Sequence, residues 1–205
     1  KLLIFDLGGV IVGHDNDLLW SRLAGLTPHA NAAPTAVTIA GAVRGSGIGD
    51  GRVSVHELHR SLVDQFQMDD DWERFAAAWS CHFSPMPTME RIIARLASTG
   101  EAAHRLMLLS NTNAEHWQYL RGHYPLLSHF ELILLSHELG LLKPGAAIYR
   151  EAARLAGVEP QECFFTDDRQ DNVDGAIAVG MDALRFESAE QIRAKLARRG
   201  VTIDD

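Results

Sequence analysis

Acidic, hydroxyl and basic side chains recur at four points where a short apolar run ends or a helix begins. They are Asp6, the pair Ser110-Asn111, Lys143, and the pair Asp167-Asp168. Carboxylates that lie close together repel one another and so favour a bound cation, and hard oxygen ligands favour Mg²⁺. An aspartate can attack phosphorus to form an aspartyl-phosphate, while a hydroxyl and an ammonium group can hold the phosphoryl oxygens. The combination therefore indicates Mg²⁺-dependent phosphoryl transfer.

Two glycines follow Asp6 in the run Phe5-Asp6-Leu7-Gly8-Gly9-Val10. Because a glycine carries no side chain, Gly8 and Gly9 let the backbone approach a phosphate closely. Backbone N–H groups in such a turn can donate hydrogen bonds to an anion. We therefore expect both glycines to contribute to substrate binding.

The elements that must position these residues are typical of an α/β fold. Short runs that are apolar throughout indicate the buried strands of a parallel sheet. These runs are Leu2–Phe5, Leu106–Leu109, Leu132–Leu135, Cys163–Phe165 and Ala183–Phe186. Helical patterns follow or precede them at Glu90–Leu96, Ala114–Arg121, Ala146–Leu155, Val173–Val179 and Glu190–Arg198. The alternation predicts a doubly wound, Rossmann-like parallel sheet, with its active site beyond the carboxyl ends of the strands.

One segment, His14–Pro85, interrupts the alternation and contains no convincing strand. A loop of this length inside a compact domain is uncommon, so we interpret the segment as an inserted helical cap. Its predicted helices are Leu18–Leu26, Val53–Phe66, and one that begins at Asp69–Asp71 and runs through Cys81. The predicted division is thus a core of residues 1–13 and 86–205 and a cap of residues 14–85. The glycine-rich stretch Gly45–Gly51 matches no phosphate-loop pattern and is interpreted as a flexible turn between cap helices.

Length and charge narrow the class of protein. The chain has 205 residues, which corresponds to one domain or to one domain with an insertion. It carries 19 Lys and Arg against 27 Asp and Glu, a net charge of −8, and no basic run. This balance disfavours nucleic acid and anionic membranes as partners. No apolar stretch approaches the ~18–20 residues that a membrane-spanning helix needs.

The cysteines and the N-terminal residues bear on the compartment. Cys81 and Cys163 are far apart in the sequence, which argues against a disulfide framework. The apolar run before Asp6 is too short for a signal peptide. We therefore expect a cytoplasmic protein, and the sequence leaves its oligomeric state open.

The motifs taken together resemble those of the haloacid dehalogenase-like hydrolases, which are mostly phosphatases. The matching segments, in chain order, are Asp6-Leu7-Gly8-Gly9-Val10, Leu108-Leu109-Ser110-Asn111, Lys143-Pro144 and Asp167-Asp168. The resemblance covers essentially the whole chain, and the insertion after the first motif is similar to that of the subgroup with a small helical cap. Several sequence segments, such as Leu109-Ser110-Asn111-Thr112-Asn113, are most similar to those of phosphatases acting on glucose 1-phosphate.

The resemblance implies a role for each residue and a small phosphorylated metabolite as substrate. Asp6 is implied as nucleophile and metal ligand, the Gly8 carbonyl as a second ligand, and Asp168 as the main ligand of the fourth motif, with Asp167 binding directly or through water. Ser110 and Lys143 are implied to hold the phosphoryl group, and Lys143 also to orient Asp6. Gly8, Gly9 and Asn111 complete the expected substrate-binding set.

One position departs from the family pattern. Most phosphatases of this family carry a second aspartate two residues after the nucleophile, which protonates the leaving group, whereas this chain has Gly8. General acid–base catalysis typically contributes ~10²–10⁴-fold in rate. The nearest replacements in the sequence are His14 and Asp15, at the entry to the cap. A sugar 1-phosphate, whose leaving group is more acidic than an ordinary alcohol, would also tolerate the loss.

Two alternative functions remain open at this stage. Relatives hydrolyse C–halogen bonds with the same nucleophile and no metal, although they lack the acid pair Asp167-Asp168. The second alternative is a catalytically weak member of the family that binds a phosphorylated ligand. Gly8, which stands in place of the second aspartate, favours this alternative. Phosphonate cleavage is disfavoured because relatives use a cap lysine for it and residues 14–85 contain none.

Other residues that could carry chemistry are interpreted structurally. His56 and His59 have helical spacing without an evident third ligand, and Trp20, Trp72 and Trp79 are expected in the cap core. Arg44 and Arg52, which flank the glycine-rich stretch, are expected at the surface.

Overall fold

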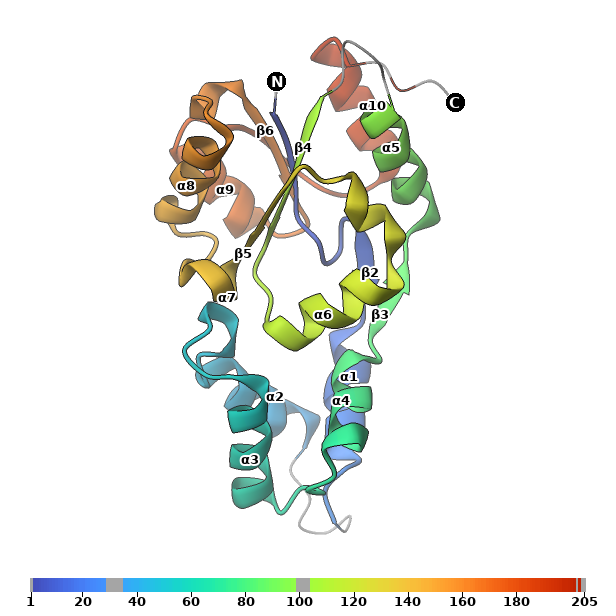
Figure 1. Cartoon of the computed structure of the whole chain (residues 1–205), viewed down its shortest axis with the longest axis vertical. Helices are drawn as coiled ribbons and strands as arrows, with labels where there is room; N and C mark the ends of the chain where they lie inside the picture. Colours follow the sequence, from blue (N-terminus) through green and yellow to red (C-terminus); the bar gives the residue numbers. More distant parts are fainter. Residues whose placement is uncertain (1, 29–34, 99–103, 202, 204–205) are drawn as a thin grey trace.

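The computed structural model describes residues 2–28, 35–98, 104–201 and 203, and its core is a parallel sheet of five strands (Figure 1). The strand order is β5-β4-β1-β6-β7, and every neighbouring pair is parallel. The strands are β1 (Leu2–Phe5), β4 (Arg105–Ser110), β5 (Leu132–Leu135), β6 (Cys163–Asp167) and β7 (Asp182–Arg185). All five predicted strands are confirmed. The first strand is central, so the carboxyl ends of β4 and β6 lie on either side of Asp6.

Helices cover both faces of the sheet and form a three-layer core. One face packs on α5 (Pro87–Ser98), α6 (Ala114–His123) and α10 (Ala189–Arg198). The other packs on α8 (Ala146–Ala156) and α9 (Gln170–Ala178). Within β1, Leu3 and Phe5 belong to the first apolar cluster and Leu2 and Ile4 to the second. Because both faces are buried, the strand is apolar at every position, which is the pattern that identified it.

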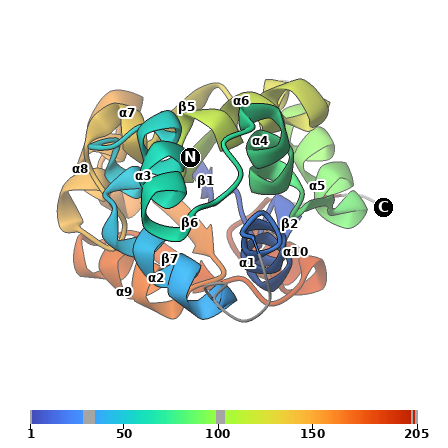
Figure 2. The same cartoon turned by 90° about the horizontal axis from the view of Figure 1, so that it is seen from below.

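A two-stranded ribbon leads out of this core to a helical unit. Strands β2 (Val12–His14) and β3 (Phe83–Pro85) pair antiparallel. Between them lie α1 (Asn16–Ala24), α2 (Ala36–Gly45), the 3₁₀ turn η1 (Ile48–Asp50), α3 (Val55–Phe66) and α4 (Trp72–Ser80). These helices bury an apolar cluster of their own and lie beyond the carboxyl edge of the sheet (Figures 1 and 2). The division of the chain at residues 14 and 85 stays a prediction, and the described cap helices fall within it.

Two expectations for the insertion were wrong. Strand β3 lies inside the segment expected to lack strands, and β2 ends on its first residue, His14. Both strands have three residues, which is too few to give a readable alternation. Helix α2 was not predicted, because its sequence is rich in glycine and β-branched residues. It forms where Ile39 and Val43 pack into the cap cluster and the Thr35 side chain accepts the Thr38 N–H.

Helices α3 and α10 both begin at a serine whose side chain accepts a backbone N–H of the first turn. Ser54 and Glu57 form a complete capping box at the start of α3. At α10 the Ser188 side chain accepts the Gln191 N–H, but the Gln191 side chain accepts from Glu187 rather than from Ser188. Such caps satisfy backbone N–H groups that the first helical turn leaves unpaired.

The remaining elements are short connections. They are the helix α7 (Ser136–Leu139) and the 3₁₀ turns η2 (Pro125–His129) and η3 (Pro160–Glu162). Cys81 and Cys163 are free thiols. In the part of the chain that the structure describes, no helix has both the length and the apolar character needed to cross a bilayer.

Candidate active site

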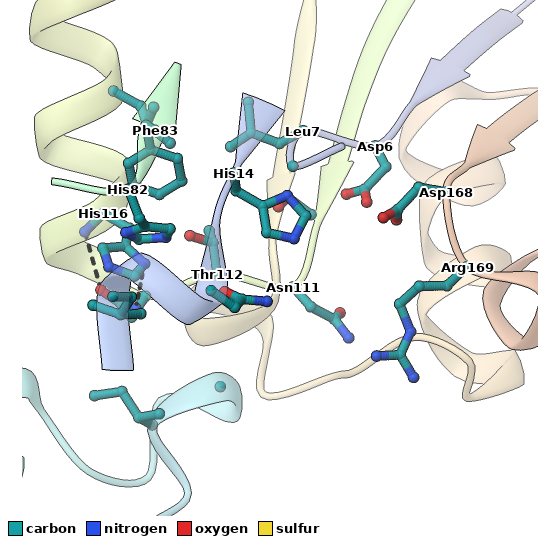
Figure 3. A pocket seen from close by; sticks show the side chains of 18 of the residues that line it. Asp6, Leu7, His14, His82, Phe83, Asn111, Thr112, His116, Asp168 and Arg169 are labelled. Atoms are coloured by element: carbon teal, nitrogen blue, oxygen red, sulfur yellow. Dashed lines mark hydrogen bonds between the residues drawn. The ribbon is translucent and has the colours of Figure 1, made fainter. Parts of the chain in front are cut away.

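A cavity of about 410 Å³ lies between the carboxyl edge of the sheet and the cap (Figure 3). Residues at the ends of β1, β4 and β6 line its core side, among them Asp6, Ser110 and Asp168. Lys143, from the loop between α7 and α8, joins them. The structure thus brings together the residues that the sequence placed at separate strand ends.

Lys143 is the centre of the polar contacts. Its Nζ lies 2.7 Å from Asp6 Oδ1 and 2.6 Å from Asp167 Oδ2, and it donates to the Leu109 carbonyl at 2.9 Å. The side chain is 1% exposed, so the ammonium group is held almost entirely by protein atoms. Because both ion pairs are short and buried, Lys143 fixes the position of the two carboxylates.

Asp167 is fully buried and its oxygens are shared among several donors. Besides Lys143, the Asn172 Nδ2 donates to Oδ1 at 2.9 Å and Oδ2 at 3.0 Å, and the Arg169 N–H donates to Oδ1 at 3.0 Å. Asn172 thus supports the site by holding the Asp167 carboxylate. Asp168, in contrast, lines the cavity directly, which makes it the more accessible carboxylate of the pair.

The three aspartates can hold a cation. Ligand oxygens of Asp6, Asp167 and Asp168 all lie within 4.8 Å of one another. Burial raises the pKa of Asp6 to about 7, with Lys143 lowering that pKa and Asp167 raising it further. Burial and then the Asp167 charge likewise raise the pKa of Asp168. With all three ionised, one lysine leaves a net charge of −2, so the donor set fits a divalent cation that prefers oxygen ligands.

Gly9 lies in the turn that follows Asp6. Its N–H donates to the Val12 carbonyl at 2.7 Å, and the residue does not line the cavity. The Gly9 amide is thus already used within the turn, and a part of Gly9 in substrate binding stays a prediction. The glycine is needed for space, because φ is +76° and a Cβ would lie 2.6 Å from Asp168 Oδ2.

Asn111 lines the cavity, yet both ends of its amide contact the Lys143 backbone. Its Nδ2 donates to the Lys143 carbonyl at 2.9 Å, and its Oδ1 accepts the Lys143 N–H at 3.0 Å. The pairing explains how a lysine in a loop is held with such precision. Ser110, 3% exposed, lines the cavity at the end of β4 as expected.

The family model of the haloacid dehalogenase-like hydrolases matches residues 1–180. The chain belongs to this family. A D-ribitol-5-phosphate phosphatase from Bacteroides thetaiotaomicron is 26% identical over 206 residues, 96% of each chain. Flavin mononucleotide hydrolase 1 from Arabidopsis thaliana is 27% identical over 157 residues, 72% of this chain. The match spans 62% of that relative, so the chain covers less than two thirds of its length.

The fold agrees with a solved member of the family. A haloacid dehalogenase family enzyme from Bacteroides thetaiotaomicron, crystallised with magnesium and inorganic phosphate, has a TM-score of 0.78 to this chain. The identity is 22%, over 91% of this chain and 94% of that one. The comparison establishes the shared fold, and the family match makes the chain a hydrolase.

The haloacid dehalogenase-like chain places a histidine beside the unusual glycine. A Cβ on Gly8 would lie 3.2 Å from His14 Nδ1, so the imidazole ring occupies the space next to position 8. His14 comes from the end of β2 and lines the cavity, where Figure 3 shows it beside Leu7 with Asp6 and Asp168 next to it. Asp15, the other candidate from the sequence, caps α1 by accepting the Leu18 N–H.

Sequence reasoning missed a contact between the cap and the core. Ser136 is fully buried, and its Oγ donates to the Gly49 carbonyl at 2.6 Å and accepts the Thr112 N–H at 3.0 Å. Gly51 packs on His137, where a Cβ would lie 2.3 Å from the carbonyl oxygen. The glycine-rich stretch is therefore more than a turn. Ser136 directly follows β5, so the strand-end argument applied to the other strands would have found it.

Three other interpretations can be compared with the described residues. His56 stacks on Trp72, and His59 forms a hydrogen bond of 3.1 Å with the Asp69 carbonyl. Within the described ranges, Asp6, Asp167 and Asp168 are the one group arranged to hold a metal. Trp20 and Trp79 line the cavity as well as packing in the cap, whereas Trp72 only packs. Arg52 pairs with Asp50 at the surface, and Arg44 is exposed.

Proposed function

We propose that this hydrolase is a Mg²⁺-dependent phosphatase that cleaves the phosphomonoester of a small metabolite through an aspartyl-phosphate on Asp6. The observation that carries the proposal is the Asp6 carboxylate, which faces the cavity beside Asp168 and is held by Lys143 at 2.7 Å. The relatives support it, since two of them are named for the hydrolysis of small phosphorylated compounds.

In the proposed reaction, Asp6 attacks phosphorus while the ester P–O bond breaks and the leaving oxygen takes a proton. Water then attacks the phosphorus of the aspartyl-phosphate, which releases inorganic phosphate and restores the Asp6 carboxylate. Lys143 orients the attacking carboxylate and lowers its pKa, and with Ser110 it binds the phosphoryl oxygens, where charge develops. Asp6, Asp168 and the Gly8 carbonyl would hold Mg²⁺, with Asp167 acting directly or through water. The ion supplies charge neutralisation for the approach of an anionic substrate to the aspartates. Asn111 positions Lys143 through its backbone, and Gly8 gives the phosphate close access.

Phosphate release from p-nitrophenyl phosphate tests the proposal. We expect turnover with Mg²⁺ and loss of turnover with EDTA. In the absence of the cation, three ionised carboxylates and one lysine carry a net negative charge, which repels a phosphate dianion. This activated ester barely needs an acid at the leaving group. Silence towards it could not be attributed to Gly8, and would instead favour the protein that binds a phosphorylated ligand without turnover.

His14 is proposed to supply the missing proton at the leaving oxygen. It is the polar side chain next to position 8, where the family pattern has the second aspartate. We expect His14→Asn to lower kcat for an alkyl ester such as glycerol phosphate by ~10²-fold and for p-nitrophenyl phosphate by less than about threefold.

His129→Asn, at an exposed histidine outside the cavity, is the matched control and should leave both rates unchanged. Equal losses on the two esters would assign His14 to folding or binding rather than to proton transfer.

A further inference from the structure

The cap side of the cavity is built from uncharged side chains. Apart from Asn16 and Gly49, those that line it from the cap helices and η1 are apolar or aromatic, namely Leu19, Trp20, Val43, Ile48 and Trp79, and Phe83 and Leu120 continue the apolar surface on the core side. A part of a substrate that extends towards the cap therefore meets mostly apolar and aromatic surface.

The acidic residues, the lysine and the arginine that line the cavity all lie on its core side. Among the described residues these are Asp6, Asp168 and Lys143 at the sheet edge and Arg169 beside them. The Arg169 guanidinium is paired with Asp171, with 2.6 Å between Nη2 and Oδ2. Lys143 is held by the two buried aspartates. Lys143 and Arg169 thus each have an acidic partner, and both lie at the sheet edge rather than in the cap wall.

Three histidines line the cavity: His14 lies beside the aspartates at the sheet edge, and the surroundings of the other two, His82 and His116, argue against an anion site there. His116 contacts Asn113 through Nδ1 and the Trp79 carbonyl through Nε2, and its ring stacks on Trp79. Burial lowers the pKa of His116 to about 3 and the pKa of His82 to about 4. Both rings are neutral at pH 7 and add aromatic surface rather than positive charge.

We propose that the substrate carries its only negative charge on the phosphoryl group, and that its leaving group is uncharged and packs an apolar or aromatic face against the cap wall. A carboxylate or second phosphate placed there would lose hydration without gaining a cation as partner. The volume of about 410 Å³ lies near the lower end of the range for ligand cavities, ~300–1,000 Å³, which limits the leaving group to metabolite size. This inference rests on the proposed phosphatase function.

Matched pairs of esters test it. Glycerol 3-phosphate and 3-phosphoglycerate differ in one group, a primary alcohol in place of a carboxylate. Phenyl phosphate and 4-carboxyphenyl phosphate make the same comparison further from phosphorus. We expect kcat/KM to be at least about tenfold higher for the uncharged member of each pair, because the carboxylate finds no partner in the wall.

A substitution in the wall should change this preference. Ile48→Lys places an ammonium group in the cavity lining, and we expect it to reduce the ratio between the members of each pair by about tenfold. Val37→Lys is the matched control, because Val37 is 75% exposed on α2 and lies outside the cavity, so it should leave the ratios as in the wild type.

The outcomes separate this inference from the function on which it rests. Equal turnover of charged and uncharged members by the wild type would overturn the inference and leave the phosphatase standing. Silence towards every ester, including p-nitrophenyl phosphate with Mg²⁺, would overturn both. An unchanged ratio in a folded Ile48→Lys variant would show that the cap wall does not set the preference.

Discussion

Asp6→Asn is expected to lower kcat for p-nitrophenyl phosphate by ~10³-fold or more, because the amide oxygen is a far poorer nucleophile than the carboxylate. No other carboxylate can replace it without rearrangement. Asp167 is fully buried and bonded to Lys143, Asn172 and the Arg169 N–H, and Asp168 belongs to a different strand end. The measurement compares the rates of phosphate release by wild type and Asp6→Asn at saturating Mg²⁺.

The variant is expected to fold, because asparagine has nearly the same shape as aspartate and removes one of three repelling carboxylates. Asp64→Asn, at an exposed position on α3, is the matched control and should keep wild-type activity. Rapid quenching adds a second readout. Wild type should accumulate phosphoenzyme that hydroxylamine releases, as expected of an acyl phosphate, and Asp6→Asn should not. Full turnover by Asp6→Asn would rule out the aspartyl-phosphate.

The strand-end residues were predictable because one rule governs them. Leu2–Phe5 is apolar at every position since both faces of β1 are buried, and the chain becomes polar at Asp6 where the sheet ends. The same holds for Ser110 after the apolar part of β4 and for Asp167 at the end of β6. Parallel strands bring these ends to one edge, so neighbours in space follow from positions in sequence.

The rest depends on contacts that no local pattern records. Asn111 bonds the backbone of Lys143, 32 residues later in the chain, and its expected part in substrate binding stays a prediction. The Gly9 N–H donates to the Val12 carbonyl, and the hydrogen bond from Ser136 to Gly49 spans 87 residues. Helix α2 forms because its apolar side chains are buried in the cap cluster, although the helix propensity of its sequence is weak. Such features follow from tertiary packing, which one sequence does not display.

Lys143→Met should strongly destabilise the protein as well as inactivate it. The ammonium lies 2.7 Å from Asp6 and 2.6 Å from Asp167, and the side chain is 1% exposed. Removing one partner of a buried ion pair typically costs about 3–5 kcal/mol, since a carboxylate is left buried without compensation. For a chain of this size each kcal/mol changes Tm by about 2–4 °C, so we expect a loss of ~6–20 °C.

The loss should depend on pH in a direction that Asp6 determines. Burial raises the pKa of Asp6 to about 7 in the folded protein from 3.8, so between these values the folded state binds a proton that the unfolded state lacks. Stability contributed by this group is therefore present at low pH and falls as pH rises through the folded pKa. Without Lys143, which lowers that pKa, the fall continues to higher pH. Metal-free Lys143→Met should thus lose more Tm at pH 8 than at pH 5.

Lys195→Met is the matched control, because Lys195 pairs with Asp182 at 2.9 Å near the surface, where ion pairs contribute ~0–1 kcal/mol. Its Tm should stay within a few degrees of wild type by the same scaling, with no added loss at pH 8. Added Mg²⁺ should raise the Tm of Lys143→Met more than that of wild type, since the ion supplies positive charge to the same aspartates. A Lys143→Met protein as stable as Lys195→Met at both pH values would show that the aspartates tolerate one another without the lysine. The charge argument for a divalent ion would then lose its basis.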